Sequence, residues 1–178
     1  MSRSNRKSAP TINEHRIQLF ALYEEYYDRI ARYVYVHIGD REEAADIAGE
    51  VFLKALTSLK SYRERGVPMQ GWLFRIAHNL TVDYVRKMNK RRPVPADSVV
   101  LLGNDDPAHM AEKNIAFDDV SEAMKQLTTE QRDVISLRFF GGLTSKEVGR
   151  TLGKSDGAVR EMQRAALERL RRIMGVQT

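Results

Sequence analysis

The sequence predicts an all-α protein with two small helical domains joined by a flexible linker. Three observations support this prediction: apolar residues recur at helical spacing, capping signals mark several helix starts, and breaks cluster between two helical segments. Proline breaks helices, and none of the five prolines lies in the interior of a predicted helix. The chain has 178 residues, 42% of them hydrophobic and 30% charged, which suits one domain or two small ones with buried cores.

The first helical segment runs from about Ile12 to Lys90. Two apolar stripes at helical spacing predict core-facing helices: Ala44, Ile47, Ala48, Val51, Phe52 and Ala55, then Leu73, Ile76, Ala77, Leu80, Tyr84 and Val85. Asp40, with Glu43 three residues later, has the spacing of a helix cap. The stretch YVYVHI (33–38) alternates like a strand, but its flanks are helical and no partner strand is evident, so we predict a helix there.

The stretch RRPVPADSVVLLGNDDP separates the two helical segments. Its prolines and glycine interrupt any long helix, so we predict a linker over 93–106. Asp106 followed by Pro107 is typical of an N-cap with proline at the first helical position. The predicted organisation is therefore a basic tail (1–15), a first domain (16–92), the linker, and a second domain (107–178).

The second domain is predicted to contain a helix-turn-helix. Its first helix would span 144–152, Gly153 and Lys154 would form the turn, and Ser155 would cap a helix that starts near Asp156. Two pairs have capping-box spacing: Thr128 with Gln131, and Thr144 with Glu147. In a helix-turn-helix the second helix enters the major groove of DNA.

The second helix of this motif has two different faces. Helical spacing gathers Val159, Met162, Ala166 and Leu170 on one face and Arg160, Gln163 and Arg164 on the other. The polar face is either a solvated surface or a surface that reads DNA. Arginine suits the O6 and N7 of guanine, and glutamine suits adenine. The capped helix and glycine turn before it favour DNA reading.

A second candidate nucleic-acid surface lies in Ser61–Pro93. It combines a loop, aromatic residues and a helix with a basic end; the basic residues are Arg86, Lys87, Lys90, Arg91 and Arg92. Aromatic rings beside basic residues suit single-stranded nucleic acid, in which bases stack and phosphates need neutralising. Trp72, Phe74 and Tyr84 could equally be core residues.

Composition narrows the function further. A net charge of +5 and a pI of about 9.5 favour a polyanionic partner. The absence of cysteine excludes disulfides, and no apolar run of membrane-helix or signal-peptide length is present, so we expect a cytoplasmic protein without membrane insertion. The histidines lack metal-site spacing and no nucleotide-binding glycine motif occurs. We therefore predict no enzyme activity, no cofactor and no metal.

Three stretches resemble bacterial sigma factors of the extracytoplasmic-function class, within the sigma-70 family. They are DIAGEVFLKAL (46–56), GWLFRIAHNLTVDYVRK (71–87) and the helix-turn-helix block 127–170. They occur in the family's order, with a linker in the expected place, and the resemblance spans about 19–170. Such proteins join core RNA polymerase, direct it to promoters, and read the −10 and −35 promoter elements.

The resemblance implies a role for each part of the chain. Region 2 would dock on the polymerase clamp helices through Asp46, Glu50, Leu53 and Lys54. The same region would recognise and help to melt the −10 element through a base pocket in the loop 62–70 and through Trp72, Asn79, Asp83, Arg86, Lys87 and Lys90. Region 4 would contact the polymerase flap and read the −35 element through Lys154, Ser155, Arg160, Gln163 and Arg164. An anti-sigma factor is a possible further partner.

Two other functions stay open on the residues alone. A stand-alone transcriptional regulator would bind duplex DNA tightly without polymerase. A helical adaptor would bind only protein and would tolerate changes at Arg160 and Arg164. Neither has a reason to carry the aromatic and basic block 61–93, which favours the sigma factor.

Overall fold

The computed structural model describes residues 10–91 and 113–175. Within these ranges the chain forms seven α-helices and one short 3-10 helix and contains no strand, which confirms the all-α prediction. The predicted linker 93–106 and the predicted cap at Asp106 and Pro107 lie outside the described residues. So do most of the predicted tail, Arg92 and the last three residues.

The first unit consists of α1 (Ile12–Ile38), α2 (Arg41–Ser58), the 3-10 helix η1 (Leu59–Ser61) and α3 (Met69–Arg91). Helix α1 begins inside the segment 1–15 that was predicted as a tail. Thr11 and Glu14 form a capping box there, which fixes the start of the helix. The alternating stretch 33–38 is helical, as predicted. Helix α1 ends at Gly39, and Asp40 caps α2 by accepting from the amide of Glu43.

The second unit consists of α4 (Lys113–Lys125), α5 (Thr129–Phe139), α6 (Ser145–Leu152) and α7 (Asp156–Ile173). Both predicted capping boxes are present, at the starts of α5 and α6. Each box satisfies amide groups that the first turn of a helix leaves without partners. These local signals are the reason that the predicted starts of α5, α6 and α7 match the structure.

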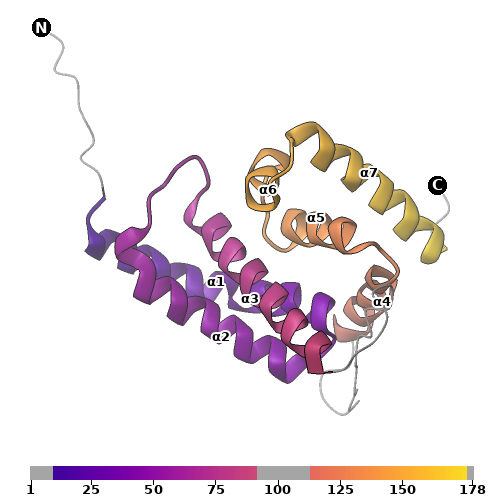
Figure 1. Ribbon diagram of the computed structural model, residues 1–178, viewed down its shortest axis with the longest axis horizontal. Coiled ribbons are helices and arrows are strands. Elements are labelled where there is room, and N and C mark those ends of the chain that lie inside the picture. Colours follow the sequence, from indigo (N-terminus) through magenta and orange to yellow (C-terminus); the bar gives the residue numbers. More distant parts are fainter. Residues whose placement is uncertain (1–9, 92–112, 176–178) are drawn as a thin grey trace, which may run out of the picture.

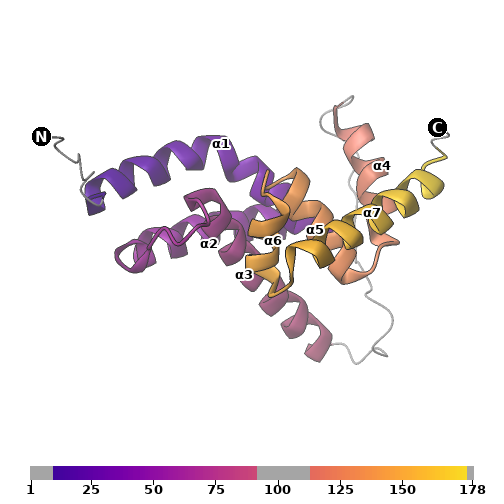
Figure 2. The ribbon, with the colours of Figure 1, turned by 90° about the horizontal axis from the view of Figure 1, so that it is seen from above.

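The two units pack directly on each other (Figures 1 and 2), through α1 with α4 and α5 and through α3 with α6. Val36 of α1 is buried in a cluster whose other members, including Met124 and Ile135, all come from the second unit. Conversely, Val134 and Leu137 of α5 join the core of the first unit. Each unit therefore buries apolar surface of the other, which stabilises the compact arrangement.

None of the described helices is both long enough and apolar enough to cross a membrane.

Candidate nucleic-acid interface

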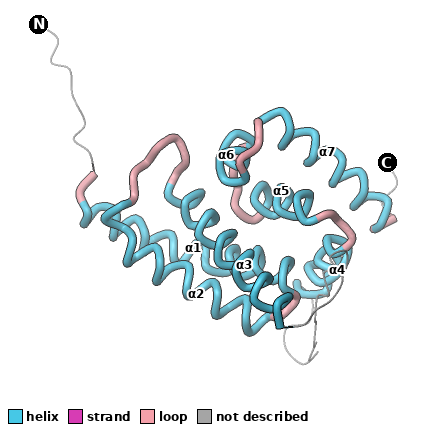
Figure 3. The backbone as a smooth tube through the Cα atoms, viewed as in Figure 1, coloured by secondary structure: helices cyan, strands magenta, loops and turns pink. Residues whose placement is uncertain are grey.

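Helices α6 and α7 form the predicted helix-turn-helix (Figure 3). Gly153 ends α6 with a φ of 67°, a left-handed conformation that favours glycine. A Cβ on Gly149 would lie 2.5 Å from the carbonyl oxygen of Lys154, so glycine lets the turn approach α6 closely. The side chain of Ser155 accepts from the amide of Ala158 and caps α7. The local sequence thus fixes the angle between the two helices.

The two predicted faces of α7 are present. Val159, Ala166 and Leu170 are buried, and Met162 is half-buried. On the other side Arg160 and Arg164 are exposed and Gln163 is half-buried. The helix therefore presents a polar face to solvent without losing its apolar contacts.

The exposed basic residues of this face form ion pairs with acidic residues of the same helix. Arg160 lies 3.0 Å from Asp156, and Arg164 lies 2.6 Å from Glu161 and 2.7 Å from Glu168. The hydrogen bond with Arg164 lowers the pKa of the Glu161 carboxyl, and the same contact raises the pKa of the Arg164 guanidinium. Exposed ion pairs contribute little to stability. A phosphate or a base edge can replace these partners at low cost.

The turn contributes two more of the predicted residues. Lys154 lies 2.6 Å from Glu130 of α5, and Ser155 is exposed beside the first turn of α7. The amide groups of that turn carry the partial positive charge of a helix N-terminus, which favours an anion. The structure thus gathers all five predicted residues around one end and one face of α7.

Gln163 has a partner that the sequence did not indicate. It lines a cavity of about 410 Å³ on the polar side of α7, with Arg138 of α5 and Ser145 of α6 on its walls. The Nε of Arg138 donates to the Oε1 of Gln163 at 2.9 Å. The two residues are 25 positions apart on different helices, so no local spacing could reveal this contact.

The predicted −10 residues form one stripe along α3. At 3.6 residues per turn, Trp72, Asn79, Asp83, Arg86 and Lys90 share one side of the helix, and Lys87 flanks it. All of these residues are exposed except Trp72, which is half-buried. Arg75 lies on the same side and is exposed. Its spacing of three from Trp72 and four from Asn79 would have identified it from the sequence.

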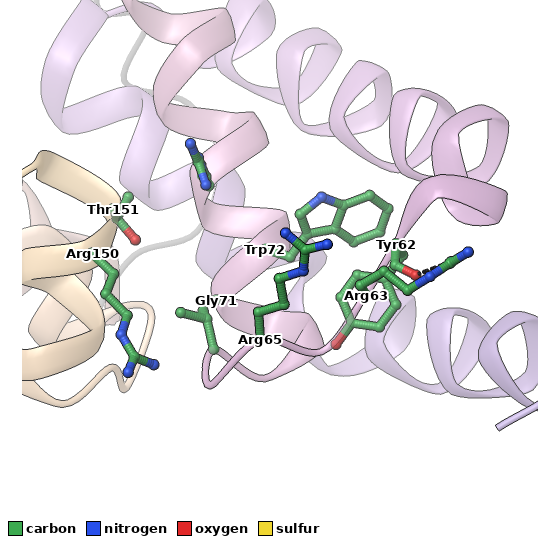
Figure 4. Close-up of a pocket in the computed structure, with 9 residues that line it drawn as sticks. Tyr62, Arg63, Arg65, Gly71, Trp72, Arg150 and Thr151 are labelled. Atoms are coloured by element: carbon green, nitrogen blue, oxygen red, sulfur yellow. Dashed lines mark hydrogen bonds between the residues drawn. The ribbon is translucent and has the colours of Figure 1, made fainter. Parts of the chain in front are cut away.

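Trp72 contributes to a cavity as well as to the core (Figure 4). The cavity measures about 210 Å³, and its lining includes four arginines, from the loop, α3 and α6. The rings of Tyr62 and Trp72 lie 4.8 Å apart at 40°. Arg150 of α6 reaches across from the second unit and donates to the carbonyl of Gly66 in the loop. A cavity therefore lies at the loop where a base pocket was predicted, and Arg150 of the other unit completes its wall.

The predicted docking residues lie on one exposed face of α2. Asp46, Glu50, Leu53 and Lys54 are all exposed, and the exposed fraction of Leu53 is 66%. Leu53 therefore does not pack in the core. Leu56, one turn along, is 40% exposed. Helix α2 therefore exposes an apolar side chain that has acidic and basic side chains on either side.

A buried polar cluster joins the two units. The Oδ1 of Asp133 in α5 lies 2.8 Å from the Nε2 of His37 in α1 and 3.6 Å from the Nδ1 of His78 in α3. The hydroxyl of Tyr33 lies 3.0 Å from the same nitrogen of His78. Burial raises the pKa of Asp133, but hydrogen bonds from His37 and His78 outweigh it, so its pKa is well below its usual value. Sequence spacing could not reveal this cluster.

No group of three or more His, Cys, Asp or Glu side chains within residues 10–91 and 113–175 is arranged to hold a metal ion.

Comparison with known proteins agrees with this geometry. The family model for sigma-70 region 2 matches residues 22–92, and that for sigma-70 region 4 matches residues 123–172. The chain is 28% identical over 86% of its length to the extracytoplasmic-function (ECF) RNA polymerase sigma factor BldN of Streptomyces coelicolor, of which the match covers 59%. It is 32% identical over 80% of its length to the ECF sigma factor SigD of Mycobacterium tuberculosis, of which it covers 70%.

The fold also has a solved counterpart. The sigma factor RpoE of Bartonella quintana, in complex with the anti-sigma factor NepR, superposes with a TM-score of 0.75 at 18% identity, covering 90% of this chain and 99% of that one. The two units thus define a protein of the sigma-70 family. More narrowly, the chain belongs to the ECF RNA polymerase sigma factors, whose activity is promoter-specific transcription initiation.

Proposed function

We propose that the chain joins core RNA polymerase, reads the −10 and −35 promoter elements with its first and second units, and assists promoter melting. The observation that carries this proposal is the presence of two separate exposed polar surfaces on one chain, the stripe on α3 and the polar face of α7. Its site of action would be the cytoplasm.

The −10 element would meet α3 and the loop before it. The cavity that Tyr62 and Trp72 help to line offers aromatic surface to an unstacked base, while Arg75, Arg86 and Lys90 neutralise the phosphates of the strand. Splaying a base out costs a few kcal/mol. A preformed pocket and several phosphate contacts offset that cost, and this is how the chain would assist melting. Asn79 and Asp83 would face the non-template strand.

The −35 element would meet α7 in the major groove. Arg160 lies in the second turn of the helix, where base contacts of a helix-turn-helix are made. Gln163 and Arg164 continue the same face. Lys154, Ser155 and the first amides of α7 would hold the neighbouring phosphates and so fix the register.

Core polymerase would meet α2. Asp46, Glu50 and Lys54 supply charges of both signs around Leu53, and an exposed apolar residue with a polar rim is a common centre of a protein interface. The clamp helices are the partner that the family relationship supports for this face, and the flap is the one it supports for the second unit.

The compact arrangement cannot bind both elements at once. The −10 and −35 elements are 25 base pairs apart by name, which corresponds to about 85 Å of duplex at 3.4 Å per base pair. In the compact form α3 and α6 are in contact, and Arg150 closes the cavity on the −10 side. The two units must separate before both read DNA. A protein that binds the compact form would hold the chain inactive, and an anti-sigma factor is the candidate, since the RpoE structure contains one.

The decisive experiment is run-off transcription from fragmented genomic DNA by core polymerase of the source bacterium, with and without this chain. New start sites with shared motifs near −10 and −35 are the expected result. If the purified chain alone binds one duplex sequence tightly and adds no start sites, a stand-alone regulator is the better function. If Arg160→Ala and Arg164→Ala leave every DNA activity unchanged, a helical adaptor is a better function than either a sigma factor or a regulator.

A further inference from the structure

Arg138 of α5 is hydrogen-bonded to the side-chain amide of Gln163 in α7. Its Nη1 donates to the backbone carbonyl of Leu143, and its Nε donates to the Oε1 of Gln163 at 2.9 Å. Both side chains are half-buried, on the wall of the cavity beside the polar face of α7. The partners of Arg160 and Arg164 are instead exposed carboxylates on α7 itself. Gln163 is therefore the member of this face whose orientation is set by another helix.

The contact engages the acceptor end of the amide. A glutamine amide carries one acceptor oxygen and one NH2 donor group. Bidentate reading of adenine needs both, because the oxygen accepts from N6 and the nitrogen donates to N7. In this chain a guanidinium occupies the oxygen. A second donor at that oxygen would also be repelled by the positive charge of Arg138, whereas an acceptor near the NH2 group would be attracted.

We infer that Arg138 is a positioning residue that turns Gln163 into a donor, so that α7 selects guanine rather than adenine at the base pair facing Gln163. Guanine presents two acceptors, N7 and O6, in the major groove, whereas adenine presents one acceptor and one donor. The inference rests on the proposed reading of the −35 element by α7. It replaces the adenine preference that glutamine alone would suggest.

The test is transcription by holoenzyme, assembled from core polymerase and the full chain, on a library with a randomised −35 element. Sequencing of the run-off transcripts gives a base preference at each position for the wild type and for Gln163→Ala, Arg138→Ala and Arg138→Lys. Thermal unfolding of each variant checks the fold. The position read by Gln163 is the one whose preference Gln163→Ala flattens.

At that position the wild type is expected to prefer a G·C pair over A·T by roughly two- to tenfold, the range of one hydrogen bond. Arg138→Ala frees the amide oxygen, so the preference should fall to none or turn to A·T, with other positions unchanged. Arg138→Lys keeps a cation and a donor and should restore part of the G·C preference.

Three results would overturn the inference: an A·T preference in the wild type, an unchanged G·C preference in Arg138→Ala, or no position that responds to Gln163→Ala. Arg160→Ala in the same library tests the proposed function separately. If Arg160→Ala still alters one position, −35 reading stands and only the role of Arg138 is wrong. If no −35 preference emerges with any protein, the proposed function fails and the inference falls with it.

Discussion

His37 of α1 and Asp133 of α5 are hydrogen-bonded across the contact between the two units, with 2.8 Å between Nε2 and Oδ1. The other ring nitrogen of His37, Nδ1, lies 2.7 Å from the carbonyl of Tyr33, which can only accept. Both ring nitrogens of His37 therefore lie within hydrogen-bond distance of an oxygen, one from each unit. Both side chains are buried, so water does not readily replace either partner in this contact.

The first prediction concerns acid. Because the pKa of Asp133 is lowered in the folded chain, its contribution to stability is complete above the ordinary carboxyl pKa of 3.8 and is lost as the pH falls below that value. Asp133→Asn should destabilise the chain by about 1–3 kcal/mol at pH 6, because His37 and His78 lose a charged acceptor. At pH 3 the difference between wild type and variant should shrink. Urea unfolding at both pH values measures it.

Glu161→Gln is the matched control for this experiment. Its carboxyl pKa is also lowered, but the residue is exposed and pairs with Arg164 on the surface. The control should leave the unfolding free energy nearly unchanged at both pH values. A stability gap for Asp133→Asn that is as large at pH 3 as at pH 6 would contradict the assignment of an ionised Asp133 to the contact between the units.

The second prediction concerns a substitution that should separate the two units. Val36 is 1% exposed, and all of its cluster partners belong to the second unit. Val36→Glu would bury an unpaired carboxylate, which is more costly than opening the contact. The radius of gyration from small-angle X-ray scattering should increase by several Å, while the helical circular dichroism signal is retained.

Val36→Ala should give a smaller increase, because it removes apolar contact without adding charge. If the opened variant transcribes better than the wild type at low polymerase concentration, the compact form opposes assembly of the chain with core polymerase. Loss of helical signal in Val36→Glu would instead mean that the units do not fold independently.

Structural features that depend on residues close together in the chain, such as helix starts and turns, could be predicted from the sequence. The capping boxes at Thr128 and Thr144 and the glycine turn at Gly153 each act within a few residues, so the starts of α5, α6 and α7 were predictable. The residues of the stripe on α3 were instead implied by the resemblance to the family, and the helical repeat then places them on one side of α3. The contacts of Asp133 with His37 and of Arg138 with Gln163 were not, because tertiary packing brings those residues together from different helices.

The third prediction tests base reading by α7. Arg160→Ala should cost about 1–3 kcal/mol of discrimination at one −35 base pair and little elsewhere. Transcription from promoters with single −35 substitutions measures this cost. Equal loss on every promoter would assign Arg160 to phosphate contact instead.

The fourth prediction concerns Lys90, at the basic end of α3. It is exposed, and a phosphate contact there would act on all sequences alike. Lys90→Ala should weaken promoter binding by holoenzyme uniformly and reduce the slope of log K against log salt by about one. Asp83→Ala on the same stripe removes a negative charge and should not reduce the salt slope. A sequence-dependent effect of Lys90→Ala would mean that it contacts a base.

The fifth prediction tests docking through α2. Leu53 is 66% exposed between Glu50 and Lys54, so Leu53→Glu should not disturb the core but should introduce a carboxylate at the centre of the proposed contact. Affinity for core polymerase should fall by about 2 kcal/mol or more, as for a central interface residue. Ala21→Glu is the matched control, since Ala21 is exposed on α1 and lies about 200° around that helix from Tyr23, which packs on α2. Fluorescence anisotropy of labelled chain titrated with core polymerase measures both variants. Equal affinities of Leu53→Glu and the wild type would move the docking surface away from α2, whereas equal losses in the two variants would point to a general effect of added negative charge.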